Sequence, residues 1–171
     1  MARSRRANAE DAARSVGNAL VLWFEGQFIS MLLIGLLSAL ATWAIGLPSP
    51  FALGFIAGMT EFIPYVGPLL AAVPAILVAS TLGLQPILWT ALAYLAIHTV
   101  EGNLVAPLVQ RQMVYIPTAV MILGIAAIGF IFGAVAIIFA APMTVVLFVL
   151  IKKLYVRDFL NEPTKIPGEQ R

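Results

Sequence analysis

The sequence "TEFIPYVGPLLAAVP", from Thr60 to Pro74, places a glutamate, three prolines and a glycine inside a strongly apolar chain. Prolines four residues apart around Gly67 do not form a straight helix, because proline lacks an N–H and clashes with the preceding turn. The pattern predicts two half-helices, Phe51 to Phe62 and Leu69 to Leu82, joined by irregular backbone. Such backbone is tolerated at membrane depth only where protein buries it or where it lines a wet cavity.

The composition identifies the class of protein. The chain has 171 residues, of which 61% are hydrophobic and 11% charged, and its mean hydropathy is +0.99. A soluble domain is roughly half apolar and about a quarter charged. We therefore predict an integral membrane protein with the lipid bilayer as its first partner. The lack of cysteine excludes disulfides and thiolate catalysis, and a net charge of +2 gives no basis for binding nucleic acid.

Three further apolar runs indicate spans. Phe28 to Leu47 is long enough to cross a bilayer core of about 30 Å, and Ile87 to Val100 is a second candidate. Ile116 to Ile151 holds 36 residues without a charge, about 54 Å of helix, which is too long for one span. We predict a hairpin there, with short spans at Pro117 to Gly129 and Gly133 to Ile151. Small residues in "GLLSALATWAIG" indicate a surface for close helix packing.

Charge bias predicts the orientation and the domains. Residues 1–19 are expected to form a cytoplasmic or interfacial helix, residues 20–151 the transmembrane helical domain, and residues 152–171 a cytoplasmic tail. Both termini should be cytoplasmic, which requires an even number of crossings. The first span, Ile87 to Val100 and the two spans of the hairpin give four crossings, so the segment Phe51 to Leu82 must add either no crossing or two. The predicted fold is an all-α polytopic transmembrane helical bundle with a Pro/Gly-broken re-entrant hairpin. The basic residues behind this orientation are Arg3, Arg5, Arg6, Arg14, Lys152, Lys153 and Arg157.

Glu61 is the sharpest candidate for a functional residue. An intramembrane ionisable group costs about 2.5–3.5 kcal/mol on insertion scales and usually faces a bundle interior or a cavity. Beside the predicted break, Glu61 could bind and release a proton or a cation, with carbonyls near Tyr65 assisting. Alternatively, Glu61 lies in the headgroup region or caps the next half-helix, and Tyr65 is an interfacial anchor.

A second polar group begins in the last turn of the span that ends at Val100. His98 and Glu101 lie one helical turn apart, as in a proton relay or cation site, or simply at a helix end near the interface. They are too few for a zinc site. Asn103 could hydrogen-bond a polar solute or finish a loop. Arg111 either pairs with Glu61 or Glu101 or faces the cytoplasm.

No catalytic set is present in the sequence. The chain contains no phosphate-binding P-loop, no GxSxG, no HExxH and no nucleophile paired with a base. We therefore predict that the protein is not an enzyme, with no catalytic residues, no metal ligands and no cofactor.

Three blocks in order give a family resemblance. The segment "EFIPYVGP", the later "VEGNLVAPLVQRQMVYIPTAVMI" and the closing "FGAVAIIFAAPMTVVL" resemble the second half of the autoinducer-2 exporter family of PerM-like permeases, over roughly Leu22 to Val156. The resemblance implies a multi-pass transporter of the bacterial inner membrane without an ATPase motor. It also implies a homo-oligomer that exports a small polar solute or exchanges Na⁺ and H⁺.

The resemblance assigns site residues by position. Glu61, Pro64, Tyr65, Gly67 and Pro68 match the family's Pro-Gly motif. With His98 and Arg111, the residues that match a second motif complete the predicted substrate and ion pathway: Glu101, Asn103 and Pro107.

Two interpretations of the function follow. Members of this family are about twice as long, so the chain is expected either to act as a secondary transporter by alternating access at a broken helix or to be a truncated membrane scaffold or subunit that needs a partner. A gene for the missing N-terminal half immediately upstream would favour the interpretation as a subunit that needs a partner.

Overall fold

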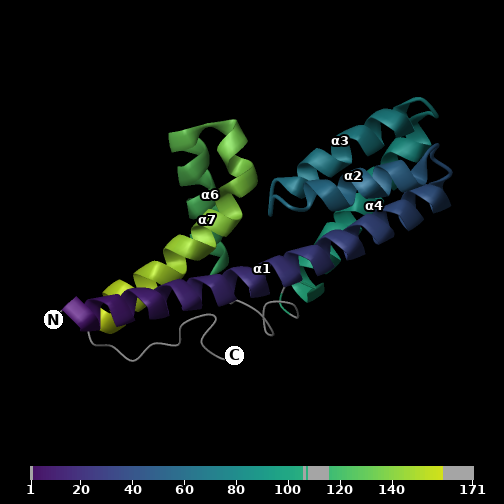
Figure 1. The fold of residues 1–171 in the computed structure, drawn as a ribbon. Coiled ribbons are helices and arrows are strands. Elements are labelled where there is room, and N and C mark those ends of the chain that lie inside the picture. Colours follow the sequence, from purple (N-terminus) through teal and green to yellow (C-terminus); the bar gives the residue numbers. More distant parts are fainter. Residues whose placement is uncertain (1, 106, 108–115, 160–171) are drawn as a thin grey trace. The chain divides into compact units, whose positions relative to one another are not determined.

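The computed structural model describes residues 2–105, 107 and 116–159, and the side chains of residues 10–105, 107 and 116–157. Over these residues the chain forms helices and turns without a strand (Figure 1). The predicted all-α class is therefore confirmed. The chain divides into two compact units, one made of residues 27–109 and the other of residues 1–26 together with 110–171.

Helix α1 (Ala2–Ile45) is 44 residues long and contributes to both units. At 1.5 Å per residue it measures about 66 Å, roughly twice the thickness of a hydrocarbon core. It ends at Gly46, whose φ of 84° lies in the left-handed region that favours glycine. The helix is continuous across residues 19 and 20, where a domain boundary is expected. That boundary concerns where the chain enters the membrane, and it stays a prediction.

The unit of residues 27–109 contains α2 (Pro50–Thr60), α3 (Gly67–Ser80), α4 (Leu84–Val100) and the π-helix η1 (Glu101–Val105). Helix α3 packs against both α2 and α4 (Figure 1). The two predicted half-helices are present, separated by six non-helical residues from Glu61 to Val66, here called the break. Pro68 and Pro74 do not extend it, because Pro68 lies in the first turn of α3 and Pro74 lies inside that helix.

Glycines bring α1 and α2 into close contact. A methyl group added at Gly54 would lie 2.5 Å from the Gly35 carbonyl oxygen and 2.6 Å from the Ala39 Cβ. One added at Gly58 would lie 2.7 Å from the Met31 carbonyl oxygen. Gly35 and Ala39 belong to the small-residue segment predicted for close packing, whereas the partner motif Gly54-x-x-x-Gly58 is an addition from the structure.

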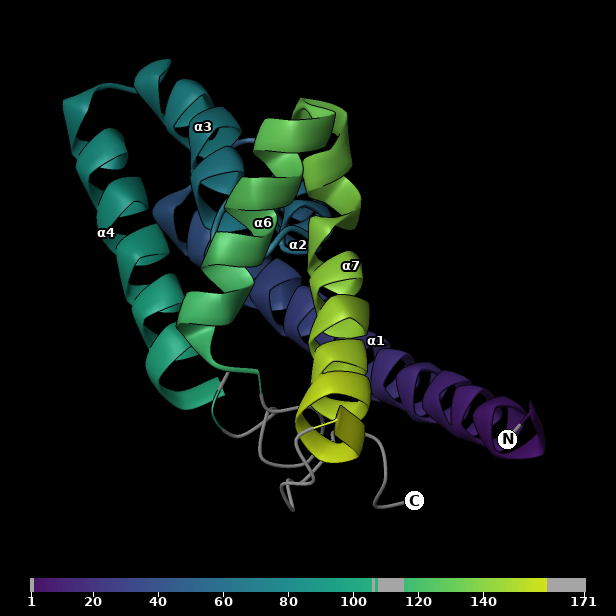
Figure 2. The same cartoon turned by 90° about the vertical axis from the view of Figure 1, so that its left-hand side faces the viewer.

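The second unit contains a helical hairpin. Helix α6 (Thr118–Phe132) is followed by the 3₁₀ turn η2 (Ala134–Ala136), by α7 (Ile137–Leu150) and by the π-helix η3 (Ile151–Phe159). Helices α6 and α7 lie side by side (Figure 2), and Gly133 makes the turn with φ of 85°. The hairpin predicted from the long uncharged run is present, but α6 continues to Phe132, past the expected end of the first span at Gly129, and α7 begins at Ile137 rather than at Gly133.

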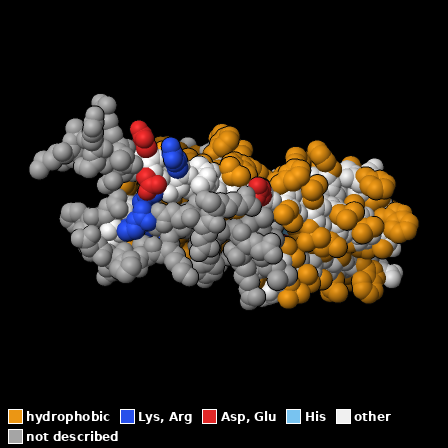
Figure 3. Space-filling view, turned by 60° about the horizontal axis from the view of Figure 1, so that its bottom comes forward, with side chains coloured by type: hydrophobic (Ala, Val, Ile, Leu, Met, Phe, Trp, Pro, Cys, Tyr) orange, Lys and Arg blue, Asp and Glu red, His pale blue; other side chains and the backbone are white. Residues whose placement is uncertain are grey.

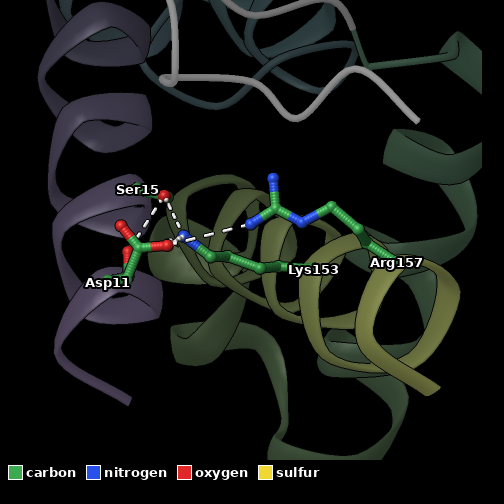
Figure 4. A network of polar contacts seen from close by, with 4 residues as sticks. All are labelled: Asp11, Ser15, Lys153 and Arg157. Carbon is green, nitrogen blue, oxygen red and sulfur yellow. Dashed lines mark hydrogen bonds and ion pairs between the residues drawn. The ribbon is translucent and has the colours of Figure 1, made fainter. Parts of the chain in front are cut away.

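A buried lysine links the first part of α1 to η3 (Figure 4). Lys153 is 1% exposed. Its Nζ donates to the Ser15 Oγ at 2.6 Å and to the Asp11 carbonyl at 2.7 Å, and lies 2.7 Å from the Asp11 carboxylate. Arg157 adds a contact of 3.8 Å to the same carboxylate. Each of the donors on Lys153 thus has an oxygen partner, as a buried ammonium requires.

Much of the surface is apolar. Large hydrophobic side chains on α1, α2, α3 and α4 are exposed, and hydrophobic side chains gather toward one side of the face shown in Figure 3. Within the described part of the chain, two helices are long and apolar enough to cross a membrane, Glu10–Ile45 and Ala134–Arg157. Exposed apolar side chains on such helices suit contact with lipid tails.

We predict that Gly54→Ala destabilises the protein although alanine favours a helix. The added methyl would overlap the backbone of α1, and overpacking of this kind costs about 1–3 kcal/mol, with about 2–4 °C of melting temperature lost per kcal/mol. Melting in detergent, followed by size-exclusion fluorescence, measures the shift. Gly102→Ala is the matched control, because a methyl there meets nothing within 4 Å. Equal melting temperatures for the two variants would contradict the close crossing.

The Asp11–Lys153 contact predicts a dependence of stability on pH. The hydrogen bond and charge of Lys153 hold the pKa of Asp11 below its ordinary value of 3.8; Asp11 precedes the apolar run of α1. A lowered pKa in the folded state means that the stabilisation is fully present above 3.8 and is lost as the pH falls through the lower folded value.

Asp11→Asn should therefore melt below the wild type at neutral pH, and the gap should close on acidification. Melting curves across this range test it. Glu10→Gln, which changes an exposed neighbouring carboxylate, should follow the wild type throughout. A gap that does not depend on pH would overturn the assignment to this ion pair.

Candidate functional site

Glu61 is buried at the break. It is the first residue after α2, its N–H donates to the Ala57 carbonyl at 3.1 Å, and the whole residue is 3% exposed. Its Oε2 has no hydrogen-bond partner among the described residues. The N-cap of α3 is Val66, and no side chain caps this helix, so Glu61 does not cap the second half-helix. The carboxylate is therefore available for a proton or a ligand.

The break is held from α1 and by glycine. The Gln27 Nε2 donates to the Glu61 carbonyl at 2.6 Å, so a side chain satisfies a carbonyl that helix hydrogen bonding would otherwise use. At Gly67, an added Cβ would collide with the Thr60 backbone, which explains the glycine. Tyr65 has φ of 67°, an unusual conformation for a bulky residue and one that is concentrated at functional sites.

His98 faces Glu61. The His98 Nδ1 lies 4.0 Å from the Glu61 Oε2, and neither ring nitrogen has a hydrogen-bond partner within the described chain. Glu101 is the first residue after α4 and lies one helical turn from His98. Glu61 and His98 thus lie together near one end of α4, and Glu101 follows that end of the helix.

The other predicted site residues fall into two groups. Pro64 and Tyr65 lie in the break, and Gly67 and Pro68 begin α3. Asn103 is exposed and its Nδ2 donates to the Thr99 carbonyl at 2.8 Å; Pro107 is exposed as well. Arg111 lies outside the described residues.

Sequence reasoning missed part of the polar interior. Thr90, Tyr94 and His98 recur every four residues and lie on one face of α4, here called the α4 polar face. Tyr94 is 3% exposed and Thr90 is fully buried, and the hydroxyls of both lack a hydrogen-bond partner among the described residues. The spacing of Thr90, Tyr94 and His98, four residues apart in a largely apolar helix, would have revealed this face.

Glu61 and His98 form a pair that can exchange a proton. At 4.0 Å the carboxylate and the imidazole are too far apart for a direct hydrogen bond, but a bridging water would let them exchange a proton, and their titrations would then be coupled. Over the described residues no three His, Asp, Glu or Cys side chains form a group that could hold a metal ion. The arrangement suits proton transfer and hydrogen bonding.

Comparison with known proteins points to membrane transport. The family model described as "AI-2E family transporter" matches residues 1–156. The chain is 34% identical to YrrI of Bacillus subtilis over 78% of its length and 29% identical to YueF of the same bacterium over 91%. Both relatives are named as transport proteins. It is 27% identical, over 66% of its length, to the AI-2 transport protein TqsA of Escherichia coli K12.

The chain spans less than half the length of these relatives. The matches cover 38% of YrrI, 44% of YueF and 34% of TqsA. No solved structure matches the chain.

We predict that Gln27→Leu destabilises the break. Removing the amide leaves the Glu61 carbonyl without its donor, and an unsatisfied buried polar group costs about 1–3 kcal/mol. Limited proteolysis and melting in detergent would show faster cleavage at the break and a lower melting temperature. Gln85→Leu, at an exposed position, is the matched control. Identical behaviour of both variants would show that Gln27 does not hold the break.

Proposed function

Because this chain belongs to the AI-2E transporter family, we propose that it is a secondary transporter of the bacterial inner membrane. The sequence contains no P-loop that could bind a nucleotide for a motor. Transport would then be driven by gradients of the solute or of an ion.

The break is the proposed transport site. The observation that carries this proposal is the buried carboxylate of Glu61, placed at the end of a half-helix and 4.0 Å from His98. Discontinuous helices with freed backbone groups are the usual way in which secondary transporters bind a substrate near the membrane midplane. Binding of a proton or cation at Glu61 would remove its charge and favour a different arrangement of the break, which is the basis of alternating access.

The proposed cargo is a small polar solute. Among the relatives, TqsA is named for AI-2 transport, and autoinducer-2 is accordingly the first candidate. H⁺ or Na⁺ is the proposed coupling ion, because Glu61, Glu101 and His98 form the ionisable end of the site. Export is the proposed direction.

The proposed membrane arrangement follows from helix lengths. Helix α2 has 11 residues and α3 has 14, about 17 and 21 Å, and neither alone crosses a core of about 30 Å. We place them as a re-entrant hairpin with both chain termini cytoplasmic. A homo-oligomer would cover part of the exposed apolar surface.

We predict that Glu61→Gln abolishes ion-coupled flux without unfolding the protein. Glutamine keeps the shape and hydrogen-bonding capacity of the side chain but cannot take up and release a proton. Purified protein in liposomes with a trapped pH dye, exposed to a sodium gradient, reports flux as a change of internal pH. The variant should give the trace of empty liposomes while its melting temperature stays near that of the wild type.

The control is Glu10→Gln, which removes an exposed carboxylate from α1 and should leave flux unchanged. Wild-type flux in Glu61→Gln would remove Glu61 from the mechanism. A flat trace for the wild type, with autoinducer-2 efflux also absent, would favour a subunit that needs a partner.

A further inference from the structure

Two buried hydroxyls in the unit of residues 27–109 differ from the other helical hydroxyls. Thr42, Thr60 and Thr99 each donate to the carbonyl four residues earlier, at 2.6–2.9 Å. Ser38 and Thr90 are fully buried, yet their Oγ atoms have no partner among the described residues. Buried hydroxyls are normally hydrogen-bonded, so a buried hydroxyl without this local bond is expected to bind another group.

These hydroxyls continue toward the ionisable pair. The Tyr94 hydroxyl lies near Ser38 on α1, and neither oxygen has a hydrogen bond of normal geometry within the described residues. The Tyr94 ring lies 6.2 Å from the His98 ring between centroids, and His98 lies 4.0 Å from Glu61. Thr90 is one turn further along the same face of α4. Polar groups therefore follow one another over about 12 Å of α4, from Thr90 to His98.

The chemistry of these hydroxyl groups favours water over a metal cation as their binding partner. Ser38, Thr90 and Tyr94, here called the hydroxyl cluster, each offer a donor and an acceptor without a formal charge. Small metal cations prefer several carboxylate or carbonyl oxygens, and the carboxylate of Glu61 is at the far end. Buried hydroxyls without a hydrogen-bond partner within the described residues suit a bridging water, and buried waters bind two to four such groups.

We propose that the hydroxyl cluster holds a chain of water molecules that leads along the α4 polar face to the Glu61–His98 pair. This inference rests on the proposed function, because such a chain would carry protons to the groups that couple transport. It assigns Ser38, Thr90 and Tyr94 to the lining of a hydrated branch inside the helices.

Single cysteines test for water directly, because the natural chain has none. Ser38→Cys and Thr90→Cys are made in the full chain and reconstituted in liposomes. Each is reacted with methyl methanethiosulfonate, a small neutral reagent. The cysteine thiolate attacks the methylthio sulfur of the reagent, forms a methyl disulfide and releases methanesulfinate, and a thiol ionises to the thiolate only where water reaches it. Mass spectrometry of the intact protein gives the rate. Ala75→Cys is the dry control, because Ala75 is fully buried in the hydrophobic core.

We expect both hydroxyl-cluster variants to react at least about fivefold faster than Ala75→Cys, since a hydrated thiol ionises and a dry one does not. A smaller ratio in variants that melt like the wild type would overturn the proposal. If one variant does not fold, the other decides. The assay does not depend on transport. Reactive thiols in a protein without flux would support the hydrated branch and contradict the transport role. Unreactive thiols in a protein with flux would contradict the hydrated branch and leave the transport role standing.

Discussion

The chain must satisfy its backbone hydrogen bonds away from water, and the break between α2 and α3 is where this constraint is hardest to meet. Pro64 has no N–H to give, and the residues around it leave the helical ladder. The Gln27 amide and the N–H of Gly67, which donates to the Ile63 carbonyl at 2.7 Å, supply part of what is lost. The buried position of Glu61 depends on this arrangement, because it follows directly from where α2 ends.

Close packing of α1 against α2 makes the arrangement possible. Gln27 reaches the Glu61 carbonyl from α1, and Met31, Gly35 and Ala39 follow it at intervals of four residues toward Gly54 and Gly58. In lipid there is little hydrophobic force between helices, so contact depends on backbones that approach closely. The glycines thus determine more than stability, because they set the distance over which a side chain on α1 can hold the break.

The sequence predicted features that depend on local chemistry. Prolines around Gly67 predicted the two half-helices, and the length of the uncharged run predicted the hairpin of α6 and α7. The approach of His98 to Glu61 could not be predicted, because it depends on how α4 is aligned against the break, and local sequence patterns do not encode that alignment. The Asp11–Lys153 pair joins residues 142 positions apart. The π-helices η1 and η3 and the left-handed backbone of Tyr65 also escaped prediction, because tertiary packing stabilises conformations that local propensity disfavours.

A proton at the Glu61–His98 pair would matter to the break for an electrostatic reason. An isolated charge in a medium of low dielectric is expensive, whereas a neutral carboxylic acid is tolerated and becomes a hydrogen-bond donor. Charged Glu61 therefore favours any arrangement of the break that brings it water or a cation, and protonated Glu61 favours the closed arrangement seen here, with 3% of the residue exposed. A hydrated hydroxyl cluster would let the proton leave while the break stays closed, so that the charge on Glu61 changes first and the conformation follows. That order would couple solute and ion movement, since the break would open only after the proton has left.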